Sequence, residues 1–508
     1  MRKIIESDYQ QVMLLPACVE DWVGGDHPAR FIREFVETLS LKEHGFKEVE
    51  SEEGGEVYAP RLLLRVWLYG YFIKIRSSRG LERGCRNEMG LIWLTGNRRP
   101  DHNTLWRFWK ANKEGLRGVF RATVQVALKL DLVGLVLQAV DGSKIQAVAS
   151  GRKAYGLEEN RRLLEALEEA ISQQEAAVEQ NGDGGSEGDD GLPDGLRHKK
   201  ELAQRVRAAI EEIESSGRKH CHPQEPEARR MESDGRNRFS YNGQVAVDSR
   251  QQVITAAEVS VQENDYGLLV PMIQEAQKQT GRTPVTLADG GYASSEQLAR
   301  AQEQGLEVMT PLPNGWRDKE GEAFHSSQFT HDALLDVVVC PQGRSIPFAH
   351  QKQRRGRSVR VYRKASVCRG CPVRSLCTSD RHGRAIDIAA DHAALVAHRQ
   401  KMRDPRARDL LRQRARIVEP VFAQIKANGG FRRWTVCGLQ NVRVQWALLC
   451  SAWNLQRIYQ HWKQLVTEGS HPFRKAFNFT ALAVQCVGQL FTKRSPSLGL
   501  APLECFMF

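Results

Sequence analysis

The stretch VLQAVDGSKIQA, Val136–Ala147, decides how the rest of the chain is interpreted. Its apolar first half predicts a buried strand within residues 132–149, and that strand reaches a single acid, Asp141, which is followed by a glycine. A carboxylate on a buried strand must find a partner, become neutral or hold a metal ion. Groups elsewhere in the sequence that could meet Asp141 decide between these outcomes.

The composition is that of a large, basic, globular protein. The chain has 508 residues, of which 41% are hydrophobic and 26% are charged. This length predicts about two to four structural units. Lys and Arg number 73 against 61 Asp and Glu, which gives a formal charge of +12. Such an excess favours a polyanionic partner, most simply nucleic acid, although many basic proteins bind none.

The sequence also bears on the compartment in which the protein works. No run reaches the roughly 18 apolar residues of a membrane span, and the N-terminal MRKIIESDYQQ lacks the apolar core of a secretory signal. Eleven cysteines are spread along the chain, with a single CxxC pair. This pattern indicates reduced thiols in a cytosol-like compartment, so we expect a cytoplasmic protein.

Residues 1–130 are predicted to form a helical N-terminal domain. The apolar run Leu62–Ile75 is too long for a strand and predicts a buried helix. Asp101 or Asn103 is suited to cap a following helix that carries Arg107. Basic side chains surround these short helices, which favours a DNA-binding module of helix-turn-helix character. A helical bundle with a solvated basic face is the alternative, and the residues alone do not separate the two.

An α/β core is predicted from residues 131–155 and 236–310. Arg238–Val261 contains two alternating runs around a turn, which predicts a β-hairpin, and a helix follows it. PVTLADGGY, Pro284–Tyr292, then brings a second short strand directly to a second acid, Asp289. The order strand, hairpin, helix, strand indicates an α/β arrangement in which two strands each lead to an acid.

Four further segments complete the chain. Residues 156–235 are predicted to form an inserted helical hairpin with a flexible acidic tip, because apolar residues recur at helical spacing on both sides of a glycine- and acid-rich run. Residues 311–395 predict a β-rich insertion that contains a cysteine cluster and a basic run. Residues 396–465 predict the C-terminal helices of the core, and residues 466–508 form a tail of unknown role.

Two strand-borne aspartates and one helix-borne glutamate, Asp141, Asp289 and Glu419, are the acids that a two-metal phosphoryl-transfer site requires. Mg²⁺ prefers hard oxygen ligands and keeps several waters, so three carboxylates can suffice for two ions. Two ions ~3.5–4 Å apart can activate an attacking oxygen and stabilise the leaving one. On the alternative interpretation, Asp141 caps a turn and Asp289 sits in its DGG turn. Glu419 would then pair with Arg416.

Several motifs give the chain a resemblance to one family. VDGSKIQA contains the first aspartate, YNGQVAVD follows the inserted helices, LADGGYAS contains the second aspartate and IVEPVFAQIK contains the glutamate. RPDHNTLWRFW resembles an N-terminal domain found in one subgroup. In this order, the motifs resemble those of the DDE transposases of bacterial insertion sequences, in the cut-and-paste group with a β-rich insertion before the final glutamate.

The resemblance implies a fold, a reaction and partners. It implies an RNase-H-like catalytic core in which Asp141, Asp289 and Glu419 bind Mg²⁺ or Mn²⁺, with two ions expected. Metal-activated water would cleave double-stranded DNA at the terminal inverted repeats of the element, and the freed 3′-hydroxyl would attack target DNA. A homodimer is expected in the DNA complex, because two DNA ends must be brought together. The expected location is the bacterial cytoplasm, in association with the nucleoid.

The resemblance also implies roles for residues near the acids. Lys426, seven residues after the glutamate, is expected to contact a phosphate near the cleaved bond, with a solvated lysine as the alternative. Tyr292 is expected either to stack on a displaced base or to pack in the core. Relatives often carry a tyrosine seven residues and an arginine four residues before the glutamate, where this chain has Arg412 and Ala415. Arg416 is the expected substitute for that arginine.

The insertion contains a second candidate metal site and a candidate DNA contact. Four of its cysteines could form a tetrahedral thiolate zinc site, although only one pair has CxxC spacing and unrelated buried thiols are the alternative. They are Cys340, Cys368, Cys371 and Cys377. The run Lys352–Lys364 has seven basic residues and no acid, so we expect it to contact DNA phosphates without reading sequence; a solvated strand is the alternative. The expected contacts are Arg354, Arg355 and Arg357.

Two rival functions fit parts of the sequence. An RNase-H-like nuclease, such as a junction resolvase, would cleave DNA with Mg²⁺ but would never join a 3′-hydroxyl to a target. A catalytically inactive descendant of a transposase would bind terminal repeats equally well with or without the three acids. The presence of Asp141, Asp289 and Glu419 together favours the enzyme.

Overall fold

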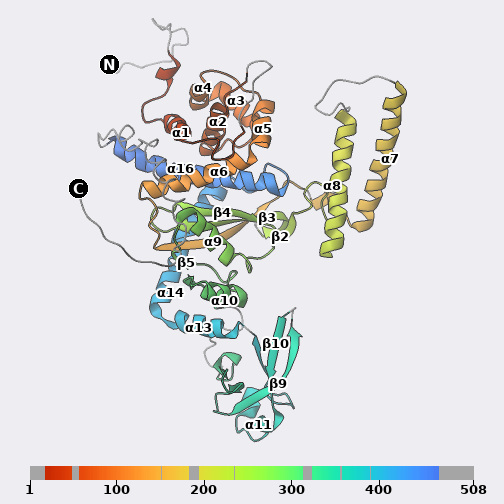
Figure 1. Ribbon diagram of the computed structural model, residues 1–508, viewed down its shortest axis with the longest axis vertical. Coiled ribbons are helices and arrows are strands. Elements are labelled where there is room, and N and C mark those ends of the chain that lie inside the picture. The colour runs from red at the N-terminus through yellow and green to blue at the C-terminus, as the bar shows by residue number, and fades with distance from the viewer. Residues whose placement is uncertain are drawn as a thin grey trace, which may run out of the picture. The chain divides into compact units, whose positions relative to one another are not determined.

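The computed structural model describes residues 18–47, 57–149, 151–181, 194–233, 235–312, 323–354, 357–389 and 391–467 (Figure 1). Most of the expected acidic tip, Arg355 and nearly all of the tail predicted for residues 466–508 lie outside these ranges. The chain divides into two compact units. One contains Met1–Phe108 and Ile458–Phe508, and the other is Trp109–Arg457. No helix within the described ranges is long and apolar enough to cross a membrane.

The first unit is helical, as predicted. Its helices are η1 (Val19–Trp22), α1 (Pro28–Glu37), α2 (Pro60–Phe72), α3 (Ser78–Asn87), α4 (Met89–Thr95) and most of α5 (His102–Ala111). The apolar run beginning at Leu62 forms α2, which is buried along most of its length because its side chains are apolar on nearly every face. The predicted cap is also confirmed, since the backbone N–H of Thr104 donates to Asp101 Oδ1 at 2.6 Å.

The end of α16 (Leu439–Thr467) also belongs to the first unit. The rings of Tyr459 and Trp462 lie 5.6 and 5.9 Å from that of Phe31, and Tyr459 donates to the carbonyl of Asp26. The first unit therefore ends near residue 108 and resumes near residue 458. The sequence had predicted an N-terminal domain that ends at residue 130. The intervening helix α6 (Lys113–Lys129) packs on a helix of the second unit's sheet layer, α9 (Leu269–Thr280).

The second unit is built on a mixed sheet of order β2-β3-β1-β5-β6, with β4 paired to β3. The strands are β1 (Leu137–Gln146), β2 (Arg229–Ser233), β3 (Arg236–Asp248), β4 (Ile254–Ser260), β5 (Val285–Leu287) and β6 (Val308–Met309). The predicted β-hairpin is confirmed as the antiparallel pair β3–β4. The stretch VLQAVDGSKIQA contains β1, which pairs antiparallel with β3 and parallel with β5.

Helices pack on this sheet. Helix α9 packs on β1, β3 and β4, and α15 (Arg414–Phe422) packs on β1 and β3. Helix α16 also contributes, because Trp446 Nε1 donates to the carbonyl of Gln244 at 2.9 Å and Asn454 is hydrogen-bonded to both backbone groups of Ile254. The core under α9 is a cluster of fully buried side chains from β1, β3, β4 and the segment after β5. The sheet that leads to Asp141 and Asp289 is thus packed by α9, α15 and α16.

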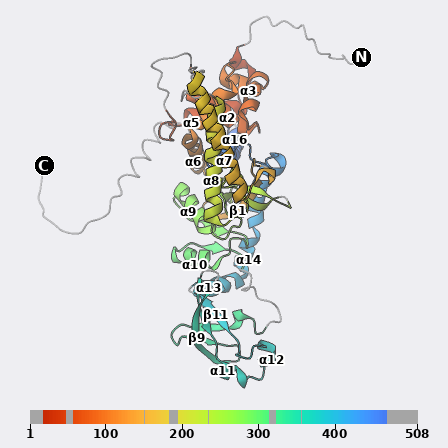
Figure 2. The same ribbon diagram turned by 90° about the vertical axis from the view of Figure 1, so that its right-hand side faces the viewer.

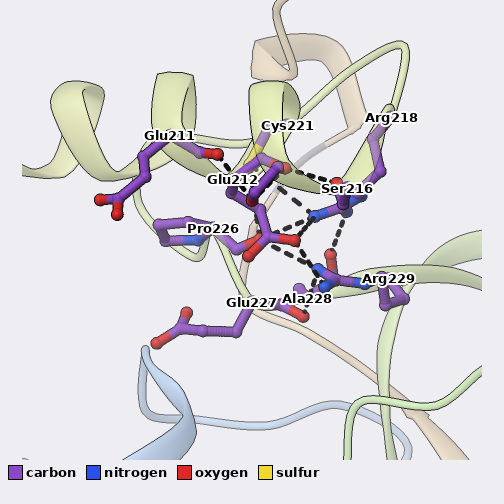
Figure 3. A network of polar contacts seen from close by, with 10 residues as sticks. Glu211, Glu212, Ser216, Arg218, Cys221, Pro226, Glu227, Ala228 and Arg229 are labelled. Carbon is purple, nitrogen blue, oxygen red and sulfur yellow. Dashed lines mark hydrogen bonds and ion pairs between the residues drawn. The ribbon is translucent and has the colours of Figure 1, made fainter.

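The inserted helical hairpin is present as α7 (Leu157–Asn181) and α8 (Asp194–Ser216), which pack on each other. A network at the base of α8 ties the hairpin to β2 (Figure 3). Arg229 Nη2 donates to Glu212 Oε1 at 2.6 Å, and the Arg218 guanidinium donates to the carbonyls of Pro226 and Ala228 at 2.9 and 2.6 Å. Figure 3 shows both arginines converging on Glu212.

The β-rich insertion contains a second sheet, of order β11-β10-β9-β8-β7 (Figure 2). Its strands are β7 (Thr330–Asp332), β8 (Val337–Val339), β9 (Ser345–Arg354), β10 (Arg357–Tyr362) and β11 (Ile386–Ala389). Two short helices, α11 (Ala365–Arg369) and α12 (Arg374–Cys377), bury none of their residues. Helices α13 (His392–Arg403) and α14 (Pro405–Arg412) follow, with α13 packed on α10 (Ser295–Glu303) and α14 on β6. The predicted α/β class is confirmed, and the described strands form two sheets.

Candidate active site

The register of β1 against β5 places the two predicted aspartates at the same level of the sheet. Ala139 pairs with Leu287 in the parallel ladder. Asp141 lies two residues beyond Ala139, and Asp289 lies two residues beyond Leu287. Because neighbouring parallel strands advance together, the two carboxylates emerge side by side.

Asp141 sits in the middle of β1 and is largely buried. Its side chain is 20% exposed, and Arg414 Nη1 lies 2.8 Å from Oδ2. The backbone N–H of Gly142 donates to Oδ1 at 2.8 Å. Burial raises the pKa of the Asp141 carboxyl, the positive charge of Arg414 opposes this rise, and the negative charge of Asp289 adds to it. The two aspartates are therefore electrostatic neighbours.

Asp289 is held by the turn that follows β5. Its Oδ1 accepts a hydrogen bond from the backbone N–H of Gly291 at 2.8 Å, so the DGG turn foreseen as an alternative does form. This turn does not exclude a metal-binding role, because the second carboxylate oxygen takes no part in it.

Glu419 lies on α15, with its side chain exposed. The packing of α15 on β1 brings this helix to the strand that carries Asp141. Nevertheless, no group of three or more His, Cys, Asp or Glu side chains within the described residues is arranged to hold a metal ion. The structure thus brings two of the predicted acids together and leaves the third on an adjacent helix.

Two cationic residues near the glutamate were expected to contact DNA, Lys426 and Arg416, the latter as the substitute for the arginine of the relatives. Arg416 lines a cavity with Ser249, Gln252 and Arg457, and its carbonyl accepts from Gln252. Arg414, two residues earlier, is the arginine that contacts Asp141. Lys426 lies on a π-helical segment, Ala423–Asn428, which continues directly from α15. Pro420 inside α15 removes a helical N–H, and π-helical segments of this kind are frequent at functional sites.

Tyr292 is packed in the core rather than displayed to solvent. It is fully buried, and its hydroxyl donates to Gln244 Oε1. Burial raises its pKa well above the ordinary value, and three nearby carboxylates add to the rise. They belong to Asp265, Asp141 and Asp289. Of the two expectations for Tyr292, packing is the one that this geometry supports, since a buried ring has no free face for a base.

A layer of polar side chains beside the aspartates was not foreseen from the sequence. Asn242 and Gln244 both donate to Asp265 Oδ1, at 2.7 and 2.8 Å. Asn242 and Gln244 sit two residues apart on β3, so their side chains share one face of the sheet. The polar residues within YNGQVAVD could have indicated this layer, but their hydrogen bonds to Asp265 are seen only in the folded chain.

The basic run of the insertion forms the β9–β10 hairpin, and several of its cations already have partners. Lys352 pairs with Asp387 at 3.0 Å, and Arg360 and Arg363 pair with Asp336 and Asp380. Arg354 and Arg357 face each other in the ladder across the hairpin end. In the first unit, Arg107 lies exposed on α5. The paired cations reduce the charge that the hairpin can offer to DNA.

The four cysteines of the insertion line a single cavity of about 30 Å³, although they come from separate elements. They are Cys340, Cys368, Cys371 and Cys377. The backbone N–H of Cys371 donates to the carbonyl of Cys368 at 3.2 Å, and that of Gly343 donates to Cys340 at 2.8 Å. The thiols are gathered, but they do not form a metal-binding geometry as they stand.

Comparison with known proteins places the chain in a class. Residues 17–111 match a family described as a transposase domain, DUF772, and residues 339–459 match a family described as a transposase DDE domain. No curated protein matches the chain. The protein is therefore a transposase, an enzyme that cleaves DNA. Together the two matches support the DDE type found in insertion sequences, as the motifs predicted, and transposases bind DNA.

Proposed function

We propose that the protein cleaves DNA at the ends of an insertion sequence and joins the freed 3′-hydroxyl to target DNA by two-metal-ion phosphoryl transfer. The observation that supports this proposal is the parallel register of β1 and β5, in which Asp141 follows Ala139 by two residues and Asp289, just past the end of β5, follows its partner Leu287 by two residues. A mixed sheet with a central β1, flanked by an antiparallel hairpin on one side and parallel strands on the other, supports an RNase-H-like core.

The residues fit the proposed ions in kind. Asp141, Asp289 and Glu419 offer the oxygen ligands that Mg²⁺ or Mn²⁺ prefers. When bound, two such ions would activate the attacking oxygen and neutralise charge on the leaving one. Burial is the main cause of the raised pKa of Asp141 and the negative charge of Asp289 adds to it, so bound cations would stabilise the ionised carboxylates. Glu419 completes the set only if its side chain turns toward β1 from α15.

The chain's own cations have separate roles in this proposal. Arg414 neutralises Asp141 when the acids hold no ion, and it is placed to contact a phosphate when they do. Lys426 on the π-helical segment would contact the DNA backbone near the cleaved bond. Arg107 on α5, and the hairpin that contains Arg354, Arg355 and Arg357, would hold the DNA through phosphates.

The proposed assembly follows from the reaction. The protein would act as a homodimer on the two terminal inverted repeats, because both ends of the element must be cut and joined together. Location in the bacterial cytoplasm, in association with the nucleoid, completes the proposal.

The test is cleavage of DNA that carries the ends of the element, by purified protein with Mg²⁺. We expect nicking by the wild type, and its loss in Asp289→Asn with DNA binding retained. Asp131→Asn is the control, because Asp131 lies exposed between α6 and β1, where it pairs with Arg250. Unchanged nicking in Asp289→Asn would remove that acid from the mechanism.

The same assay separates the rival functions. Joined products containing target DNA indicate a transposase, while nicking without joining indicates a nuclease of the resolvase kind. Binding of the terminal repeats without any nicking, in the wild type and in Asp289→Asn alike, indicates an inactive descendant.

We also propose that the insertion binds a structural zinc ion through its four thiols. The insertion has a small core, in which a cluster of six buried side chains is joined by Cys340 and Cys377, and α11 and α12 bury no residue. An ion shared by Cys340 after β8, Cys368 on α11, Cys371 after α11 and Cys377 on α12 would stabilise an insertion whose own core is small. The thiols would have to close on the ion, since they are not yet arranged around one.

A further inference from the structure

Asp265 lies in the loop between β4 and α9 and is the acceptor for two buried amides. Its Oδ1 accepts from Asn242 Nδ2 at 2.7 Å and from Gln244 Nε2 at 2.8 Å. Both amide side chains are 1% exposed. One oxygen of Asp265 therefore fixes two side chains that cannot turn to water for a substitute partner. Hydrogen bonds to a charged acceptor are stronger than those between neutral groups.

One of these amides reaches the strand of the first catalytic aspartate. Gln244 pairs with Gly142 across the β1–β3 ladder. A methyl group added at Gly142 would lie 2.0 Å from Gln244 Nε2 and 2.9 Å from Asn242 Oδ1. The amides thus lie directly against the backbone beside Asp141. Gln244 also accepts from the hydroxyl of Tyr292.

The other oxygen of Asp265 faces the turn of the second catalytic aspartate. A methyl group added at Gly291 would lie 3.6 Å from Asp265 Oδ2 and 3.0 Å from Asp289 Oδ1. Gly291 is also the residue whose N–H holds Asp289. Asp265 consequently adjoins both halves of the candidate site.

We propose that Asp265 is a positioning residue, which sets the relative placement of Asp141 and Asp289 through the Asn242–Gln244–Tyr292 layer. Asn242 and Gln244 support Gly142 and hence the carboxylate before it. Tyr292 follows the DGG turn and anchors it through the hydrogen bond from its hydroxyl to Gln244. The inference rests on the proposed function, because it concerns the spacing of the two acids that would hold the ions.

Two substitutions at Asp265 distinguish the loss of the hydrogen-bond acceptor from the loss of the negative charge. Asp265→Asn keeps an oxygen that can accept from both amides, whereas Asp265→Ala removes the acceptor. Glu263→Ala is the matched control, because Glu263 is exposed in the same loop. Binding of Mn²⁺ to the protein, followed by electron paramagnetic resonance, reports on the acids without requiring activity. Single-turnover nicking and DNA affinity are measured on the same variants.

For Asp265→Ala we expect Mn²⁺ affinity and nicking rate to fall roughly 10–100-fold, with unchanged affinity for the terminal DNA. For Asp265→Asn we expect a loss of less than about fivefold in both. Glu263→Ala should match the wild type.

Several results would overturn the inference. Wild-type Mn²⁺ binding by Asp265→Ala would show that the layer does not set the site. Equal losses in both variants would make the negative charge itself the requirement. A loss of DNA affinity or thermal stability in Asp265→Ala, together with a normal Asp265→Asn, would reduce Asp265 to a structural residue. If wild-type protein binds Mn²⁺ but nicks no DNA, the proposed function fails. The effect of the Asp265 variants on Mn²⁺ affinity still tests the positioning role.

Discussion

Gly142 shows how closely the backbone at Asp141 is packed. Its neighbour Gln244 is a flexible side chain in principle, but hydrogen bonds to Asp265 and Tyr292 fix it in place. A side chain at position 142 would have to displace this amide. The glycine of the VDG motif is therefore required by the amide layer across the ladder.

The corresponding prediction concerns Gly142→Ala. We expect the free energy of unfolding to fall by about 1–3 kcal/mol, as for other overpacked sites, and nicking to fall with it. Gly151→Ala is the control, because nothing lies within 4 Å of the added methyl group, and its change should stay under about 0.5 kcal/mol. Thermal and urea unfolding measure both. Equal stability of the two variants would show that Gln244 moves freely.

Glu225 is a buried acid outside the candidate active site. Its carboxylate accepts from the backbone N–H groups of Ala149 and Gly438 and from the hydroxyl of Tyr241. Burial raises its pKa above the ordinary value of 4.5, and these hydrogen bonds only partly oppose the rise. The folded state therefore keeps the Glu225 proton to a higher pH than the unfolded chain does.

A pH dependence of stability follows from that shift. The contribution of Glu225 to the free energy of unfolding is fully present below pH 4.5 and declines as pH rises through the raised folded pKa. Glu225→Gln cannot titrate, so the advantage of the wild type over this variant should shrink between pH 4.5 and neutrality. Urea unfolding at several pH values measures this difference in the free energy of unfolding, and Glu303→Gln, at an exposed position, is the control. An advantage that grows with pH would contradict the assigned shift.

At the scale of elements, the helical hairpin depends on its base. Arg218 is 15% exposed and satisfies two backbone carbonyls, whereas Arg207 is 55% exposed and pairs with Glu168 across the two helices. A buried arginine with fixed acceptors contributes more than an exposed ion pair, whose partners water can replace.

We expect Arg218→Ala to destabilise the hairpin attachment by about 1–3 kcal/mol, and Arg207→Ala by no more than about 1 kcal/mol. Limited proteolysis should cut the first variant faster at the segment between α8 and β2. Similar cleavage rates for the two variants would show that the network in Figure 3 does not hold the hairpin.

The insertion gives a second prediction at this scale, based on the proposed zinc site. Full-length protein purified without chelators should contain about one zinc ion per chain. Cys371→Ser should lose it, while Cys18→Ser, at an exposed cysteine of the first unit, should retain it. Elemental analysis of the purified proteins measures the metal. Zinc content that is equal in both variants, or absent from the wild type, would refute the site.

For the whole molecule, we expect from the charge of +12 that the affinity for DNA falls as the salt concentration rises. Arg107 on α5 is exposed, whereas Arg86 on α3 is ion-paired with Glu82 at 3.1 Å. We expect Arg107→Ala to weaken binding to all DNA sequences and to reduce the slope of log affinity against log salt by about 1. Arg86→Ala should change the slope less. Titrations at several salt concentrations decide, and an unchanged slope in Arg107→Ala would place this residue outside the interface.

The sequence by itself determined the elements and which of them lead to Asp141 and Asp289, because hydrophobic periodicity and turn residues act over a few neighbours in the chain. It also determined the family, since short motifs keep their order. Only the tertiary structure decided the partners of those acids. Arg414 lies 273 residues from Asp141 in sequence, and Asp265 meets Asn242 and Gln244 only when the loop after β4 folds against β3. No local pattern encodes such contacts, because they depend on how distant elements pack.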